Sequence, residues 1–323
     1  MEGPRDLITK LKNSDNYFER QKAAWALVGL GEKSIDALVD ALENGEQSEI
    51  RYKAAWALGK IKCVRSIDLL ARAMLSDPDH TVREWCAAAL EEVGDRSAAH
   101  HLVDAMKSDD AKDVRLRAAM ALRNLGAVDA LMELLKHPAP ETRGMAIIGL
   151  ARLKHAAALD DVVGQVKDED TEVRRRATAF LGEIRSEKAL ETLATVLADE
   201  KAVVREEALR SLGKIKGQKA CSIALDALKD EVPEIRLTAV TTLGEIGHSD
   251  ALEPLVDIVF GDDWRDIRAW AAWSLGEIGD RKAVEHLKKA CQICPFEVRE
   301  KARATLEECF GEMVSDLDLP EEP

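Results

Sequence analysis

Apolar residues recur along this chain at helical spacing, and one such pattern returns about every 31 residues. In the segment IRYKAAWALGKI, the apolar positions that follow Arg51 are Ala54, Ala55, Leu58 and Ile61. At about 100° per residue, these four positions share one face of a helix. The pattern therefore predicts an amphipathic helix that begins near the arginine.

Six further segments align with this one without gaps, among them VRRRATAFLGEI and IRAWAAWSLGEI, and three weaker copies complete a set of ten. Successive copies are 31 or 32 residues apart, except for one step of 28 residues between Arg115 and Arg143. The shortfall lies around Gly126, and we expect a local change of curvature there. The ten aligned arginines are Arg20, Arg51, Arg83, Arg115, Arg143, Arg174, Arg205, Arg236, Arg268 and Arg299.

Each copy also contains an apolar segment before its arginine, such as SIDLLARAML at 66–75 or ALETLATVLA at 189–198. Turns such as SDPDHT, with aspartate and proline, suit the end of one helix and the start of the next. The sixth position after the arginine is almost always small, which permits close approach of neighbouring helices. We therefore predict an all-α fold, an α-solenoid of about ten helix pairs with a period of about 31 residues.

An aspartate stands six residues before the arginine in six copies, as in Asp77/Arg83 and Asp168/Arg174. Together with the AAxALGxIG pattern, this spacing resembles the short HEAT repeats of the phycobilisome-lyase HEAT-like class. The resemblance covers nearly the full chain and implies a HEAT-like solenoid. It indicates little about activity, because the same fold serves scaffolds, lyases, a hydroxylase and DNA glycosylases.

The repeated aspartate and arginine pairs are interpreted as structural rather than catalytic. We predict a ladder in which each guanidinium binds carboxylates and turn carbonyls within and between repeats. The repeats leave no interval for another domain, so we expect one solenoid over residues 1–311. Residues 312–323 are expected to be an acidic, disordered tail. The alternative is that Leu317 and Leu319 of this tail bind in the concave groove of the solenoid and compete there with partners.

The second helix of each repeat has a face that points away from the core, at positions +2, +5 and +9 from the arginine. The HEAT-like resemblance implies that this face is the concave surface. Aromatic side chains with one exposed face are typical anchors of recognition surfaces, although they could also cover the groove floor by packing along adjacent repeats. Five of the six tryptophans occupy these positions: Trp25, Trp56, Trp85, Trp270 and Trp273.

Basic residues share the same stripe, mostly in the first seven repeats. A basic, tryptophan-bearing groove on an acidic chain favours a protein or peptide partner with acidic and apolar features. The alternative is ordinary solvated charge. The candidate protein-binding residues besides the tryptophans are Lys22, Lys53, Lys60, Arg117, Met120, Arg152, Arg176 and Arg210.

The composition of the chain argues against several classes of function and indicates a cellular compartment. The formal net charge of -14 argues against a dedicated nucleic-acid binder, because such proteins neutralise phosphates with lysine and arginine. No apolar segment resembles a membrane span or a secretion leader, and the six scattered cysteines are typical of thiols in a reducing compartment. We therefore expect a cytoplasmic protein.

Candidate chemistry is sparse. None of the seven histidines is followed by glutamate, whereas the HEAT-like enzyme deoxyhypusine hydroxylase has repeated His-Glu dipeptides as iron ligands. Cys291 and Cys294 form a lone C-x-x-C, which would need further ligands such as Cys309 and His286 to hold zinc. We expect no metal and no cofactor. The sequence thus favours a non-catalytic scaffold or adaptor; a bilin-lyase-like tetrapyrrole-handling factor is the alternative, and a nucleic-acid-binding HEAT-like protein is a less favoured one.

Overall fold

The computed structural model describes residues 2–262 and 264–313, and all of the regular structure in these residues is helical. In this described part of the chain, twenty α-helices follow one another as ten pairs, which confirms the predicted fold class. The helices group into two compact units, residues 1–158 and 159–323, which are described separately. The continuous solenoid over residues 1–311 stays a prediction, and most of the acidic tail, residues 314–323, lies outside the described residues.

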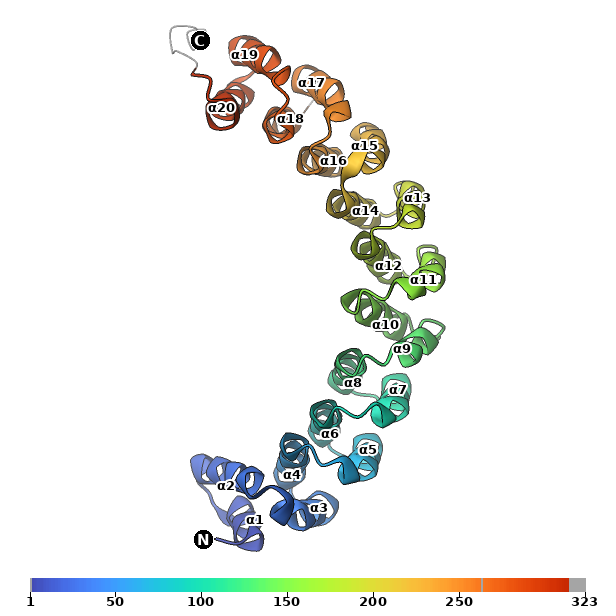
Figure 1. Ribbon diagram of the computed structural model, residues 1–323, viewed down its shortest axis with the longest axis vertical. Coiled ribbons are helices and arrows are strands. Elements are labelled where there is room, and N and C mark those ends of the chain that lie inside the picture. The colour runs from blue at the N-terminus through green and yellow to red at the C-terminus, as the bar shows by residue number, and fades with distance from the viewer. Residues whose placement is uncertain (1, 263, 314–323) are drawn as a thin grey trace. The chain divides into compact units, whose positions relative to one another are not determined.

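The first unit contains five helix pairs. Its even-numbered helices form one layer and its odd-numbered helices form the other, as Figure 1 shows. Single turns of 3₁₀-helix precede several of the odd-numbered helices. The helices are α1 (Pro4–Asn13), α2 (Tyr17–Leu30), η1 (Gly31–Ser34), α3 (Ile35–Asn44), α4 (Ser48–Ile61), η2 (Val64–Ser66), α5 (Ile67–Ser76), α6 (His80–Val93), η3 (Arg96–Ala98), α7 (Ala99–Ser108), α8 (Lys112–Asn124), α9 (Val128–Leu134), α10 (Pro140–Arg152) and η4 (Ala156–Ala158).

The second unit repeats this arrangement with five further pairs. The last helical element among its described residues is a short π-helical turn, which extends the last even-numbered helix. Its helices are α11 (Leu159–Gln165), α12 (Thr171–Ile184), α13 (Glu187–Val196), α14 (Ala202–Ile215), α15 (Gly217–Asp226), η5 (Ala227–Lys229), α16 (Pro233–Ile246), η6 (Ser249–Ala251), α17 (Leu252–Gly261), α18 (Arg265–Ile278), α19 (Ala283–Ile293), α20 (Phe296–Thr305) and η7 (Leu306–Phe310).

Adjacent even-numbered helices within a unit approach closely where a glycine faces a small residue of the next repeat. A Cβ atom at Gly182 would lie 2.9 Å from the Cα atom of Ser211, and one at Gly59 would lie 2.7 Å from the Cα atom of Ala89. The hydroxyl of Ser211 uses this proximity to donate a 3.0 Å hydrogen bond to the carbonyl of Thr178. The small residues predicted at the sixth position therefore do permit close helix packing.

Most even-numbered helices have a C-cap residue with positive φ, which is either glycine or a basic residue. After α8 and α10 such a residue, Gly126 or Lys154, comes one position later. Gly94 has φ 79° after α6, whereas Lys62 has φ 57° after α4 and Arg185 has φ 52° after α12. Glycine adopts this left-handed conformation readily, but a residue with a Cβ atom does so at a cost. Near Gly126 the chain shortens α9 to 7 residues, against 10 in α7, and the predicted change of curvature there stays a prediction.

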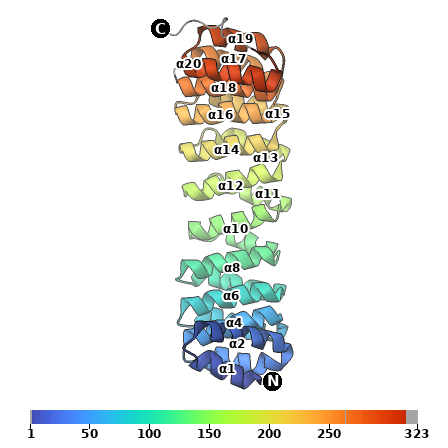
Figure 2. The same cartoon turned by 90° about the vertical axis from the view of Figure 1, so that its left-hand side faces the viewer.

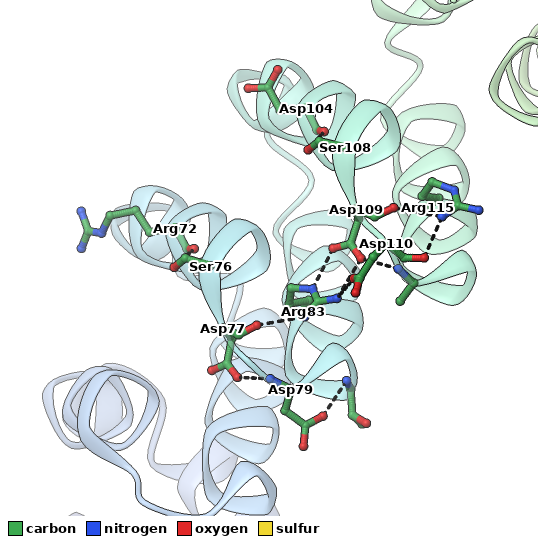
Figure 3. A network of polar contacts seen from close by, with 12 residues as sticks. Arg72, Ser76, Asp77, Asp79, Arg83, Asp104, Ser108, Asp109, Asp110 and Arg115 are labelled. Atoms are coloured by element: carbon green, nitrogen blue, oxygen red, sulfur yellow. Dashed lines mark hydrogen bonds and ion pairs between the residues drawn. The ribbon is translucent and has the colours of Figure 1, made fainter. Parts of the chain in front are cut away.

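The predicted ladder runs along the turns that join the two helices of each pair, and Figure 3 shows one rung. Arg83 donates from Nε to Asp109 Oδ2 at 2.8 Å and from Nη2 to Asp109 Oδ1 at 2.9 Å. Its Nη1 donates to the backbone carbonyl of Asp77 at 3.0 Å. Asp77 belongs to the same repeat and Asp109 to the next one. Each arginine of this kind thus ties two successive turns together.

The ladder adapts where the aspartate is missing. Arg115 pairs with Glu141 at 2.7 Å, and Arg20 pairs with Glu49 at 2.9 Å. Arg268 faces the last repeat, which lacks its aspartate, and donates instead to the carbonyl of Val259 at 2.8 Å and to Cys294 Sγ at 3.5 Å. The guanidinium therefore keeps hydrogen-bond partners even where the sequence repeat is broken.

Candidate protein-binding surface

The even-numbered helices of the first unit present one face away from the odd-numbered helices, and Figure 2 views the chain from this side. The predicted tryptophans of this unit stand at position +5, as Trp25 and Trp56, or at position +2, as Trp85. Trp25 on α2 is 58% exposed and Trp85 on α6 is 37% exposed, whereas Trp56 on α4 is half-buried. The structure therefore brings three of the five predicted tryptophans onto adjacent helices.

These indoles pack against one another and against a further aromatic ring. The ring centroids of Trp25 and Trp56 are 4.8 Å apart in an edge-to-face arrangement. Trp85 stacks on Tyr52 with a centroid distance of 6.1 Å and an angle of 22° between the rings. Such pairs add about 0.5–1.5 kcal/mol beyond area burial. Mutual packing thus holds the rings in place while leaving parts of them exposed.

Two more exposed aromatic residues, which were not among the predicted binding residues, lie at the start of α2. Tyr17 is 54% exposed and Phe18 is 73% exposed. They precede Arg20 by three and two residues, so neither stands at a +2, +5 or +9 position, although Phe18 shares the helix face of Trp25 seven residues later. The only sequence signal was two adjacent aromatics at a helix start. We use the name aromatic surface for the set Tyr17, Phe18, Trp25, Trp56 and Trp85.

Lys53 was expected to project from this face, but its side chain is only 4% exposed. Its ammonium lies 5.5 Å from the centroid of the Tyr17 ring and 5.6 Å from that of Tyr52. It also lies 3.7 Å from Glu49 Oε1. The two rings and the carboxylate satisfy the cation and cover it. We therefore leave Lys53 out of the proposed binding surface.

The predicted basic character of the face is largely neutralised by neighbouring carboxylates. Lys60 pairs with Glu92 across two helices at 2.6 Å, and Arg117 lies 3.6 Å from Glu84. Lys22 pairs with Glu19 at 2.9 Å. Exposed pairs of this kind contribute little to stability, but they lower the net charge that a partner meets. Charge alone therefore does not select an acidic partner here.

A hollow of about 310 Å³ lies between α4, α6 and α8 in the aromatic surface. Trp56 and Trp85 form two of its sides, and Ala88 and Ala89 are also part of its lining. The remaining lining residues are charged: Lys60, Glu91, Glu92 and Arg117.

The apolar stripe at position +5 continues along the unit beyond this hollow. Met120 on α8 is half-buried, and Ile148 on α10 is 42% exposed. Arg152 on α10 is exposed. Ile148 was not among the predicted binding residues, although its position matches that of Trp25 and Trp56. The face thus has an apolar residue at this position in each of its five repeats.

The other predicted residues belong to the second unit. Trp270 and Trp273 lie on α18 with ring centroids 5.3 Å apart, and the ammonium of Lys301 lies 5.0 Å from the Trp270 ring centroid. Two predicted cations of this unit form ion pairs within their own helices, Arg176 with Glu172 at 2.8 Å and Arg210 with Glu206 at 2.6 Å. The second unit therefore has a smaller aromatic pair of its own.

Metal and thiol chemistry add little. Within residues 2–262 and 264–313, no group of three or more potential metal-ligating side chains is close enough to hold an ion. Cys291 and Cys294 are buried free thiols, and burial raises the pKa of Cys291. No described helix combines the length and the apolar character needed to cross a bilayer.

The sequence matches the family model described as HEAT repeats along most of its length. The chain has no match among curated proteins. The matched ranges are residues 4–91, 35–123, 128–213, 165–234, 191–275 and 222–307.

Solved structures give the same fold. Kap121p bound to Pho4p aligns with a TM-score of 0.67 at 14% identity, over 97% of this chain and 42% of that chain. Kap95p from a study of RanGDP aligns with a TM-score of 0.62 at 14% identity, over 96% of this chain and 49% of that chain. The CpcE and CpcF complex of phycocyanin lyase from Nostoc sp. PCC7120 is 25% identical over 69% of this chain and 92% of that chain, but its TM-score of 0.37 supports no conclusion about activity.

Proposed function

This chain belongs to the HEAT-repeat family, and we propose that it is a non-catalytic scaffold or adaptor that binds a protein partner through the aromatic surface of its first unit. Stacked repeats expose extended faces, which suit protein surfaces better than small substrates. Proteins of the same fold are seen with protein partners, Kap121p with Pho4p and Kap95p with Nup1.

The observation that carries the proposal is the exposure of aromatic side chains on one face. Trp25 is 58% exposed and Phe18 is 73% exposed, although a solvated chain gains nothing from presenting such rings to water. Exposed apolar patches of this kind mark interaction sites. Tryptophan and tyrosine are also enriched among the residues that dominate binding energy. The aromatic surface therefore has the composition of a protein-binding hot spot.

Affinity purification from the native host tests this proposal. Proteins retained by the wild-type chain are compared with those retained by Trp25→Ala and Trp85→Ala variants, and each candidate is then titrated with purified components. We expect both substitutions to weaken binding at least about tenfold. Trp264→Ala is the matched control, because Trp264 is 51% exposed but lies before α18 in the other unit. A partner that binds all four proteins equally would contradict the proposal.

A further inference from the structure

The hollow between Trp56 and Trp85 arises from a change in the sequence repeat. Position +5 holds Trp25 and Trp56 in the first two copies but Ala88 in the third. Position +2 holds lysine in the first two copies but Trp85 in the third. The third repeat therefore lacks an indole at position +5, where Ala88 leaves a gap, and its own indole, Trp85 at position +2, lies beside that gap.

Both tryptophans that flank the gap are held by other rings. Trp56 packs edge-to-face against Trp25, with centroids 4.8 Å apart. Trp85 stacks on Tyr52 at 6.1 Å. This packing already restricts the side-chain conformations of Trp56 and Trp85. Less side-chain entropy is therefore lost when a group binds in the hollow between them.

Charge complementarity indicates what the hollow accepts. Its lining includes two cations, Lys60 and Arg117, and two carboxylates, Glu91 and Glu92. A cationic guest would face the two basic groups and an anionic guest the two acidic ones, so neither sign is favoured. A cavity of roughly 150 Å³ is large enough for benzene, and this hollow measures about 310 Å³. An uncharged side chain the size of phenylalanine or leucine therefore fits its volume and its charge.

We propose that the Trp56–Trp85 hollow is an anchor pocket, which takes one bulky uncharged side chain from a segment of the protein partner. This inference rests on the proposed function, and it specifies which part of the aromatic surface recognises a particular side chain of the partner. Because the pocket charges balance, anchor binding depends only weakly on salt.

The test uses amino-acid probes and a matched pair of variants in the full chain. N-acetyl-phenylalaninamide and N-acetyl-leucinamide are titrated while the indole N–H signals of Trp56 and Trp85 are followed by NMR. N-acetyl-argininamide and N-acetyl-glutamic acid amide are the charged probes. We expect the uncharged probes to shift both signals with half-saturation on the order of millimolar. Equal or stronger shifts with a charged probe overturn the proposal.

Ala88→Trp fills the pocket with the residue that the two preceding repeats hold at the same position, Trp25 and Trp56. Ala179→Trp is its control, because Ala179 occupies position +5 of another repeat in the second unit and is also half-buried. We expect Ala88→Trp to lower probe and partner affinity at least about tenfold and Ala179→Trp to leave both within twofold. If Ala88→Trp does not fold, Ala88→Leu provides a smaller filling group with the same expected direction.

The outcomes separate this inference from the proposed function. A partner that loses affinity for Trp25→Ala but binds Ala88→Trp as well as the wild type overturns the anchor pocket and leaves the surface standing. A partner that binds Trp25→Ala, Trp85→Ala and Ala88→Trp normally overturns both.

Discussion

Arg174 binds Asp199 of the following repeat through two hydrogen bonds, from Nε to Oδ2 at 2.7 Å and from Nη2 to Oδ1 at 3.1 Å. Its Nη1 also donates to the carbonyl of Asp168 in its own repeat at 2.9 Å. Both side chains of the ion pair are about nine-tenths buried, at 8% and 10% exposure. One guanidinium therefore joins two turns by contacts that water hardly reaches.

Arg174→Ala should lower the free energy of unfolding by about 3 kcal/mol, because it strands the buried carboxylate of Asp199. Chemical denaturation followed by circular dichroism measures the change. Arg210→Ala is the control, since Arg210 is 58% exposed in its pair with Glu206 and should change stability by less than about 0.5 kcal/mol. An unchanged unfolding transition for Arg174→Ala would contradict the interpretation that the ladder stabilises the fold.

Two glycine-to-alanine substitutions should act in opposite directions. Alanine favours helix by about 1 kcal/mol over glycine, and a Cβ atom at Gly29 would meet no atom within 4 Å. Gly29→Ala should therefore stabilise the chain by up to about 1 kcal/mol. A Cβ atom at Gly182 would lie 2.8 Å from the Ser211 side chain, so Gly182→Ala should destabilise it by about 1–3 kcal/mol. Denaturation midpoints of the two variants check the signs, and a stabilised Gly182→Ala would contradict the close packing of α12 on α14.

Glycine should be stabilising after α4 and α12. Lys62 and Arg185 have φ 57° and 52°, a region in which a Cβ atom is strained by about 1–2 kcal/mol. Lys62→Gly and Arg185→Gly should each raise the free energy of unfolding by about 0.5–1 kcal/mol, after the greater entropy of unfolded glycine is counted. Lys62→Ala is the control, because alanine retains the Cβ strain. Thermal melts that rank alanine at or above glycine at position 62 would refute this account.

Acid should destabilise the second unit partly through Glu172. Hydrogen bonds from Arg175 and, to a smaller extent, from Arg176 lower the pKa of Glu172 to about 2, whereas a glutamate in an unfolded chain has a pKa of about 4.3. A carboxylate whose folded pKa is lowered stabilises the fold above the unfolded pKa, and this contribution is lost as the pH falls from about 4.3 towards 2. Stability measured across this range should fall less steeply for Glu172→Gln than for the wild type. Equal slopes would show that the Arg175 and Arg176 contacts do not persist in solution.

Much of the fold could be predicted because one arginine-centred pattern recurs ten times. The repeated spacing of Asp77 and Arg83 within one copy indicated the ladder, and the small residues at Ala89 and Ser211 indicated close helix packing. Each of these features repeats, so independent copies support the same interpretation. The family resemblance identified the fold as HEAT-like but predicted neither an activity nor a binding site.

The binding face was harder to predict because its features do not repeat. Adding charges along the stripe gave a basic total, but Lys60 and Glu92 hold the same position in successive repeats and bond to each other at 2.6 Å. Comparing the same position between neighbouring copies would have revealed this pair. Nothing local marks Lys53 as buried, because Tyr17, one of the rings that cover it, belongs to the preceding repeat. The hollow above Ala88 likewise depends on side chains from three helices.

The most direct test of the central claim is the affinity of a purified partner for the wild-type chain and for its Trp25→Ala and Trp85→Ala variants. Isothermal titration calorimetry measures it, and cooperative unfolding of each variant shows that the fold is intact. If the aromatic surface binds the partner, each substitution weakens binding at least about tenfold, and Trp264→Ala binds like the wild type. Equal affinity of both variants and the wild type would contradict the claim that this chain recognises proteins through its aromatic surface.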